Sequence, residues 1–103
     1  MDSIASPAVS PAALQGVRVI EMGQLIAGPF CGKTLGEFGA DVIKIEAPET
    51  GDPLRNWRLI KEGTSVWWQV QSRNKRSVAL DLRQKEGQDI ARQLIAEADV
   101  LVE

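Results

Sequence analysis

The sequence has no histidine and a single cysteine, Cys31. The usual zinc ligand sets, and a Ser-His-Asp or Cys-His catalytic site made from this chain alone, are therefore excluded. One cysteine also rules out an internal disulfide. No apolar run approaches the roughly 18 residues of a membrane-spanning helix, so we expect no membrane partner. Twelve Lys and Arg residues against 14 Asp and Glu residues give a net charge of −2 without a basic stripe, and nucleic acid is not an expected partner.

The chain has the length of one small domain. Its 103 residues, 44% of them hydrophobic, suit a single globular unit with a modest core. Residues 1–13 are small, interrupted by proline and free of Lys and Arg, unlike a secretory signal or a mitochondrial presequence. We therefore predict a disordered leader over residues 1–13, a domain over residues 14–103 and a cytoplasmic location.

Two apolar runs, 17–22 and 41–46, flank a glycine-interrupted segment of helical character. Two runs of strand length joined by a helical crossover predict a βαβ unit with parallel strands, and hence an α/β fold. The near-continuous apolar character of the first run indicates a strand that helices cover on both faces. Ligand sites of such units lie at the carboxyl ends of the strands. We therefore expect the site in the loops after Met22 and Glu46.

Gly28, Gly32 and Gly36 recur every four residues along the crossover helix. Interior glycines weaken a helix, so this line predicts a close approach of another group. For Gly32 and Gly36 we expect tight packing of helix on strand. Gly28, next to a proline that favours the first helical turn, is a candidate for backbone approach to a ligand.

The second half of the chain continues the α/β pattern. An apolar run at 78–82 predicts a strand, residues 85–98 predict an amphipathic helix, and residues 99–103 begin a further strand. The helix places its apolar residues on one face: Ile90, Ala91, Leu94, Ile95 and Ala98. Because an apolar strand is normally covered, we expect this chain to be a fragment of a longer protein.

Two clusters lie between the second run and this strand. The three tryptophans, Trp57, Trp67 and Trp68, are expected to be packing anchors, with a short helix over 67–72. The basic stretch 73–77 opens the strand at 78–82, and we expect it beside the ligand side of the sheet, where it is a candidate for phosphate contact.

Residues Ala27 to Thr34 nearly form a phosphate-binding loop, Gly, four residues, then Gly-Lys-Ser/Thr. Ala27 replaces the first glycine. Pro29 removes one of the N–H groups that such a loop needs, and it starts the helix too early. A nucleotide-triphosphate site is therefore disfavoured by the sequence.

From Leu14 onward the chain resembles the amino-terminal part of the family III CoA-transferases, the group that includes the formyl-CoA and carnitine CoA-transferases. The matching segments follow the family's order and spacing over most of the chain: residues 14–21, 27–29, 35–46, 51–52, 74–77 and 98–103. The resemblance implies a Rossmann-like half-domain with a parallel sheet. It also implies an enzyme that moves CoA from an acyl-CoA thioester to a free carboxylic acid.

The resemblance places CoA contacts on three segments of this chain. Ile26 and Ala27 correspond to the loop near the reacting thioester, and the adenine end corresponds to Leu80, Asp81, Leu82 and Arg83. The basic cluster Asn74, Lys75 and Arg76 is a further candidate. Two departures bear on specificity. Formyl-CoA transferases have glutamine at the position of Ile26, and its replacement favours a different acid. They have arginine at the position of Ala47, so we expect one CoA contact to be missing or supplied elsewhere.

In this family an aspartate forms the covalent acyl-enzyme and CoA-enzyme intermediates. It lies beyond the position of Glu103, so the resemblance assigns no catalytic residue and no metal ligand to this chain, which we expect to be inactive alone. The implied partners are acyl-CoA, a small carboxylic acid and a second copy of the chain in an interlocked homodimer, without a permanently bound cofactor. The alternative is a non-catalytic nucleotide-binding or interaction domain that uses Ala27 to Thr34.

Overall fold

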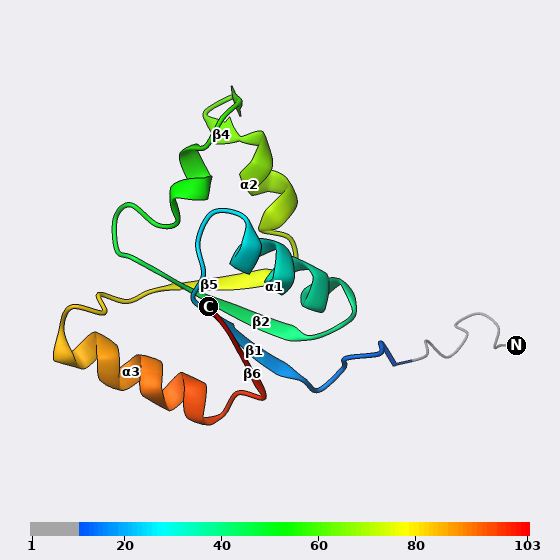
Figure 1. Cartoon of the computed structure of the whole chain (residues 1–103), viewed down its shortest axis with the longest axis vertical. Helices are drawn as coiled ribbons and strands as arrows, with labels where there is room; N and C mark the ends of the chain where they lie inside the picture. The colour runs from blue at the N-terminus through cyan, green and yellow to red at the C-terminus, as the bar shows by residue number, and fades with distance from the viewer. Residues whose placement is uncertain (1–10) are drawn as a thin grey trace, which may run out of the picture.

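The computed structural model describes residues 11–103 (Figure 1). Most of the predicted leader, residues 1–10, lies outside the described residues. Four parallel strands form the main sheet: β1 (Arg18–Glu21), β2 (Asp41–Glu46), β5 (Lys75–Ala79) and β6 (Val100–Val102). Their order in the sheet is β5-β2-β1-β6. The chain forms β1 first, adds β2 and β5 on one side of it, and then returns to add β6 on the other side. The predicted parallel α/β fold is confirmed.

Two helices cover opposite faces of this sheet. Helix α1 (Ala27–Glu37) connects β1 to β2, and α3 (Lys85–Ala96) connects β5 to β6. Alternate strand residues build one core on each face, because successive side chains of a strand point in opposite directions. Val19, Val42 and Val102 pack with Leu35 of α1. On the other face, the core contains Ile20, Ile45, Leu80, Ala91, Leu94 and Ile95.

The chain between β2 and β5, residues 47–74, leaves the sheet and forms a small substructure at one end of the molecule (Figure 1). We call it the β2–β5 excursion. It contains the 3-10 helix η1 (Pro53–Asn56), the antiparallel pair β3 (Ile60–Lys61) and β4 (Thr64–Ser65), and helix α2 (Val66–Gln71). Trp57 and Trp67 meet edge to face at 5.4 Å, and Arg55 lies 4.0 Å from the ring centre of Trp68. The tryptophans pack within the excursion, as predicted.

Element boundaries differ from the sequence expectation in two places. β5 begins at Lys75 and ends at Ala79, whereas the apolar run predicted a strand over 78–82. The strand ends early because the chain turns after Leu80, where Gln84 N–H donates to the Asp81 carbonyl at 3.1 Å. In α3, Ile90 is 44% exposed, so the apolar face of this helix is narrower than the pattern indicated. No helix within residues 11–103 combines the length and apolar character needed to cross a bilayer.

Candidate functional site

A cavity of about 770 Å³ opens at the carboxyl ends of the strands. Three segments that are distant in sequence form its walls. They are the residues after β1 (Met22 and Gln24), the end of β2 with its loop (45–50), and the residues after β5 (Leu80, Asp81, Leu82 and Arg83). The site expected after Met22 and after Glu46 therefore corresponds to an open cavity in the structure.

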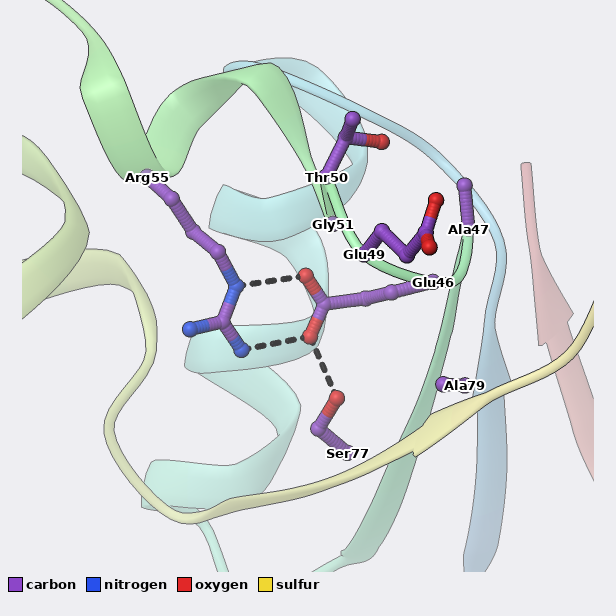
Figure 2. A pocket seen from close by; sticks show the side chains of 8 residues that line it. All are labelled: Glu46, Ala47, Glu49, Thr50, Gly51, Arg55, Ser77 and Ala79. Carbon is purple, nitrogen blue, oxygen red and sulfur yellow. Dashed lines mark hydrogen bonds and ion pairs between the residues drawn. The ribbon is translucent and has the colours of Figure 1, made fainter.

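A smaller cavity of about 210 Å³ adjoins the same β2 loop (Figure 2). Its floor is the carboxylate of Glu46. Arg55 donates to it twice, from Nε to Oε1 at 2.8 Å and from Nη2 to Oε2 at 2.7 Å, and the Ser77 hydroxyl also donates to it. Burial alone would raise the pKa of Glu46, but the hydrogen bonds from Arg55, Ser77 and the Asp52 N–H lower it to about 2. Glu46 is therefore an ionised anchor for the excursion.

Beneath the turn that follows β1 lies a buried group of charges. Lys44 projects from β2 toward the α1 face, and its Nζ lies 2.7 Å from Glu21 Oε2 and 2.8 Å from Asp52 Oδ2. It also donates to the Gly23 carbonyl at 3.0 Å. The three charged side chains are at most 1% exposed, so their charges must be compensated by neighbouring side chains and not by water. We call Glu21, Lys44, Asp52 and Lys75 the buried charge cluster.

Lys75 completes this cluster under α1. Its Nζ lies 2.8 Å from Glu21 Oε1 and donates to the Pro29 carbonyl at 2.8 Å. Burial lowers the pKa of Lys75, and the hydrogen bond to Glu21 opposes that shift. Gly32 leaves the space for this arrangement, because a Cβ there would lie within van der Waals overlap of the Glu21 carboxylate. Packing, as expected, accounts for Gly32.

Asp52 connects the excursion to the turn after β1. Its Oδ1 accepts from Leu54 N–H at 2.9 Å, which caps η1, and from Leu25 N–H at 3.0 Å. Leu25 has φ of 66°, a left-handed conformation that costs energy for a residue with a side chain. The turn between β1 and α1 is therefore held in place by hydrogen bonds to its carbonyl at Gly23 and its amide at Leu25.

Gly28 is buried in a backbone contact and is not exposed at the helix start, contrary to our expectation from the sequence. It is buried, and a Cβ on it would lie 2.7 Å from the Cα of Gly23. The two glycines pack backbone against backbone where the turn enters α1. A glycine is therefore required at position 28 because a side chain there would prevent the turn from closing against α1.

The basic cluster also lies elsewhere than expected. Because β5 runs parallel to β2 and begins at Lys75, residues 73–76 are at the amino-terminal end of the sheet, away from the cavity. Arg76 Nη2 contacts both oxygens of Asp41 at 2.9 and 2.8 Å, Arg73 pairs with Glu37 at 2.9 Å, and Asn74 is exposed. The predicted position beside the ligand side is wrong, while a CoA contact from Asn74, Lys75 or Arg76 stays a prediction.

The phosphate-binding-loop interpretation fails on geometry. Helix α1 begins at Ala27, so Gly32, Lys33 and Thr34 lie within regular helix rather than in an anion-binding loop. Lys33 Nζ lies 3.7 Å from Glu37, and the Thr34 hydroxyl donates to the Phe30 carbonyl at 2.9 Å. No free backbone N–H groups surround a phosphate position there.

The remaining predicted contacts fall in two groups. Leu80, Asp81, Leu82 and Arg83 line the large cavity together. The side chain and then the backbone N–H of Arg83 lower the pKa of Asp81, which stays ionised. Ile26 and Ala27 are exposed at the start of α1, next to the held turn but outside the cavity lining. Their contact with CoA stays a prediction.

Sequence reasoning missed the buried charge cluster. Lys44 and Glu21 looked like the polar positions of strands, and Asp52 like a loop residue. The sequence did contain one indication. Glu21 lies in a strand that was expected to be covered on both faces, and a buried charged side chain must be paired with one of opposite sign. Among residues 11–103 the structure contains no group of His, Cys, Asp and Glu side chains suited to a metal ion.

Comparison with known proteins agrees with this architecture. The family model described as CoA-transferase family III matches residues 14–103. Succinyl-CoA–D-citramalate CoA-transferase of Chloroflexus aurantiacus is 48% identical over 94 residues, which are 90% of this chain and 23% of that protein. Formyl-CoA:oxalate CoA-transferase of Escherichia coli is 42% identical over 91 residues, which are 87% of this chain and 22% of that protein.

A solved structure shows the same fold. The CAIB/BAIF family protein from Brucella suis superimposes with a TM-score of 0.80 at 41% identity, covering 89% of this chain and 25% of that one. The chain thus spans about a quarter of the length of these relatives. Because the family model matches almost all of the described residues, the chain belongs to CoA-transferase family III.

Proposed function

We propose that the native polypeptide containing this chain transfers CoA from an acyl-CoA thioester to a free carboxylic acid. Family membership supports the reaction class. The observation that carries the proposal to these residues is the cavity at the carboxyl edge of the sheet, which the segment 80–83 lines. The same segment corresponds to the one that holds the adenine end of CoA in the family.

The chemistry of the cavity wall suits a nucleotide end. Leu80, Leu82, Met22 and Ile45 provide apolar surface for a flat base. The Arg83 side chain is 89% exposed, and among residues 11–103 its close side-chain partner is Asp81 at 3.1 Å, which leaves most of its donors available for phosphate oxygens. Ile26 and Ala27, which flank the held turn, would approach the thioester end. The cluster 74–76 lies at the opposite end of the strands from the cavity, and a CoA contact there rests on the family resemblance alone.

In the proposed mechanism a carboxylate attacks the thioester carbonyl and CoA thiolate leaves, giving an acyl-enzyme anhydride. The thiolate then attacks the enzyme carbonyl and releases the acid, so the activated bond is conserved as an enzyme thioester. An acceptor carboxylate repeats the sequence in reverse. The buried acids of this chain do not suit the nucleophile, because Glu21, Asp52 and Glu46 are each neutralised by a cation. We place the nucleophilic aspartate outside residues 1–103.

The same proposal covers assembly and location. We propose that the native polypeptide forms the interlocked homodimer of its family, acts in the cytoplasm, and uses CoA thioesters as substrates rather than a permanently bound cofactor. Since Ile26 replaces the glutamine of formyl-CoA transferases, we expect an acid other than formate or oxalate. The name of the Chloroflexus relative makes succinyl-CoA the first donor to test.

The experiment is a binding and turnover assay on the native polypeptide. Calorimetric titration with CoA should give saturable binding, while ATP with magnesium should give none. Incubation with succinyl-CoA and a panel of dicarboxylic and hydroxy acids, followed by mass spectrometry, should reveal a new acyl-CoA. Absence of CoA binding together with binding of ATP would overturn the proposal in favour of a nucleotide-binding domain.

A further inference from the structure

The turn between β1 and α1 forms one wall of the large cavity, since Met22 and Gln24 line it. Its backbone is not stabilised by a hairpin or by a side-chain cap: Ile26 at the start of α1 makes no side-chain cap hydrogen bond. Leu25 also occupies a left-handed conformation. Something outside the turn must therefore determine its conformation.

That external support comes from two side chains of the buried charge cluster. Lys44 Nζ donates to the Gly23 carbonyl at 3.0 Å, and Asp52 Oδ1 accepts from Leu25 N–H at 3.0 Å. The two side chains are themselves joined, with Lys44 Nζ 2.8 Å from Asp52 Oδ2. Backbone groups on both sides of Gln24 are thus tied to a single buried ion pair.

Asp52 belongs to the β2–β5 excursion, whose residues 47–50 line the large cavity together with the turn. Its backbone N–H donates to Glu46 Oε1 at 2.8 Å, and Glu46 is fixed by Arg55. Its carboxylate also caps η1 through Leu54 N–H. The position of Asp52 is therefore set by its contacts with Glu46 and Leu54, so it provides a fixed reference for the turn.

We propose that Asp52 is a positioning residue for ligand binding: it holds the Gly23–Leu25 turn in the conformation that forms the Met22 and Gln24 wall of the cavity. Asp52 is 1% exposed and does not itself line the cavity. It acts through the Leu25 amide. The effect on CoA binding rests on the proposed function, whereas the effect on the turn does not.

The test compares three variants of the native polypeptide. Asp52→Asn keeps an acceptor for Leu25 N–H but loses the charge opposite Lys44, and Asp52→Ala loses both. Val42→Ala is the matched control, because Val42 is also about 1% exposed and packs on the α1 face without contacting the turn. It should lower the melting temperature without a specific effect at the cavity.

The first readout is hydrogen–deuterium exchange of peptides that cover residues 23–26, with peptides from 85–96 as the internal reference. Exchange at the turn should accelerate in the order wild type, Asp52→Asn, Asp52→Ala, while α3 is unchanged. Val42→Ala should show no turn-specific acceleration. If Asp52→Ala does not fold, Asp52→Asn decides the result. Unchanged exchange at the turn in a folded Asp52 variant overturns the inference.

The second readout is CoA affinity. A hydrogen bond to a charged group contributes more free energy than one to a neutral group. We therefore expect the dissociation constant for CoA to rise on the order of tenfold in Asp52→Asn and to change little in Val42→Ala. Equal weakening in both variants would mean general destabilisation and would overturn the positioning role. If the wild type does not bind CoA, the proposed function fails, and the exchange measurement still decides whether Asp52 holds the turn.

Discussion

Arg55 holds Glu46 through two parallel hydrogen bonds, 2.8 Å from Nε to Oε1 and 2.7 Å from Nη2 to Oε2. The pair joins the last residue of β2 to the first helical turn of the excursion, and Trp68 covers the guanidinium from the other side. Planar two-point pairs of this kind are geometrically specific, so Arg55 fixes how the excursion leaves the sheet.

This pair predicts a pH dependence of stability. The pKa of Glu46 is lowered from 4.5 to about 2 in the folded state, so ionised Glu46 stabilises the fold above pH 4.5. That stabilisation is lost as the pH falls from 4.5 toward 2, because the unfolded chain then takes up the proton first. Urea unfolding at a series of pH values should therefore show a decrease in unfolding free energy across this window.

Arg55→Met tests the assignment of that decrease to Glu46. Without the guanidinium, the pKa of Glu46 should rise, and the decrease in unfolding free energy over the same window should become smaller. Arg92→Met is the control, since Arg92 is 70% exposed and its ion pair, with Asp89 on the same helix, is 3.4 Å long. If the unfolding free energy of Arg55→Met decreases as much as that of the wild type over this pH range, another carboxylate is responsible for the loss of stability in acid.

Lys44→Met should be severely destabilising. The substitution leaves Glu21 and Asp52 buried without their shared cation, and breaking a buried pair in this way costs about 3–5 kcal/mol. Lys85→Met is the matched surface control, with a lysine that is 82% exposed, and it should change stability by less than about 0.5 kcal/mol. Chemical denaturation measures both. A loss at Lys44 no larger than the surface loss contradicts the burial of the cluster.

Gly28→Ala should destabilise by overpacking. The added Cβ would lie 2.7 Å from the Cα of Gly23, and backbone cannot move aside as a flexible side chain can, so we expect a loss of about 1–3 kcal/mol. Cys31→Ala, three residues further along α1 at an exposed position, should be within about 0.5 kcal/mol of wild type. Thermal unfolding of the two variants distinguishes packing from general helix effects.

Arg83→Gln should weaken CoA binding by roughly three- to tenfold, since it removes one exposed charge from the cavity wall. Stability should be unaffected because this side chain is solvent-exposed. Arg92→Gln changes a surface arginine of α3 that lies outside the cavity lining and should leave the affinity unchanged. Titration calorimetry at low salt measures both, and equal effects would indicate nonspecific attraction.

Hydrophobic periodicity predicted most of the fold. The run at 41–46 corresponds to β2 residue for residue, and the expected helix at 85–98 is observed as Lys85–Ala96. These elements depend on local pattern and on the burial of one face, which the sequence records directly. The start of β5 was misplaced because Lys75 and Arg76 look like loop residues, although Lys75 is a strand residue with a buried partner.

The site was predicted only where it follows from topology. A site was expected at the carboxyl edge of the sheet, and a cavity lies there because parallel strands bring these loops together. The segment 80–83, which came from the family resemblance, lines that cavity, and its contact with CoA stays a prediction. The partners of Lys44 could not be read from the sequence, because Glu21 and Asp52 come from different segments and meet only through tertiary packing. The interpretation of Gly28 failed for the same reason: its neighbour, Gly23, is not on the same helix.

The backbone contact between Gly23 and Gly28 also limits how the cavity can be altered. A side chain at either position would collide with the other residue's main chain, so neither substitution can compensate for the other. Gln24 and Ile26 are exposed on the same turn and carry no such restriction. Protein engineering can therefore vary these two side chains while the backbone of the turn beneath them stays the same.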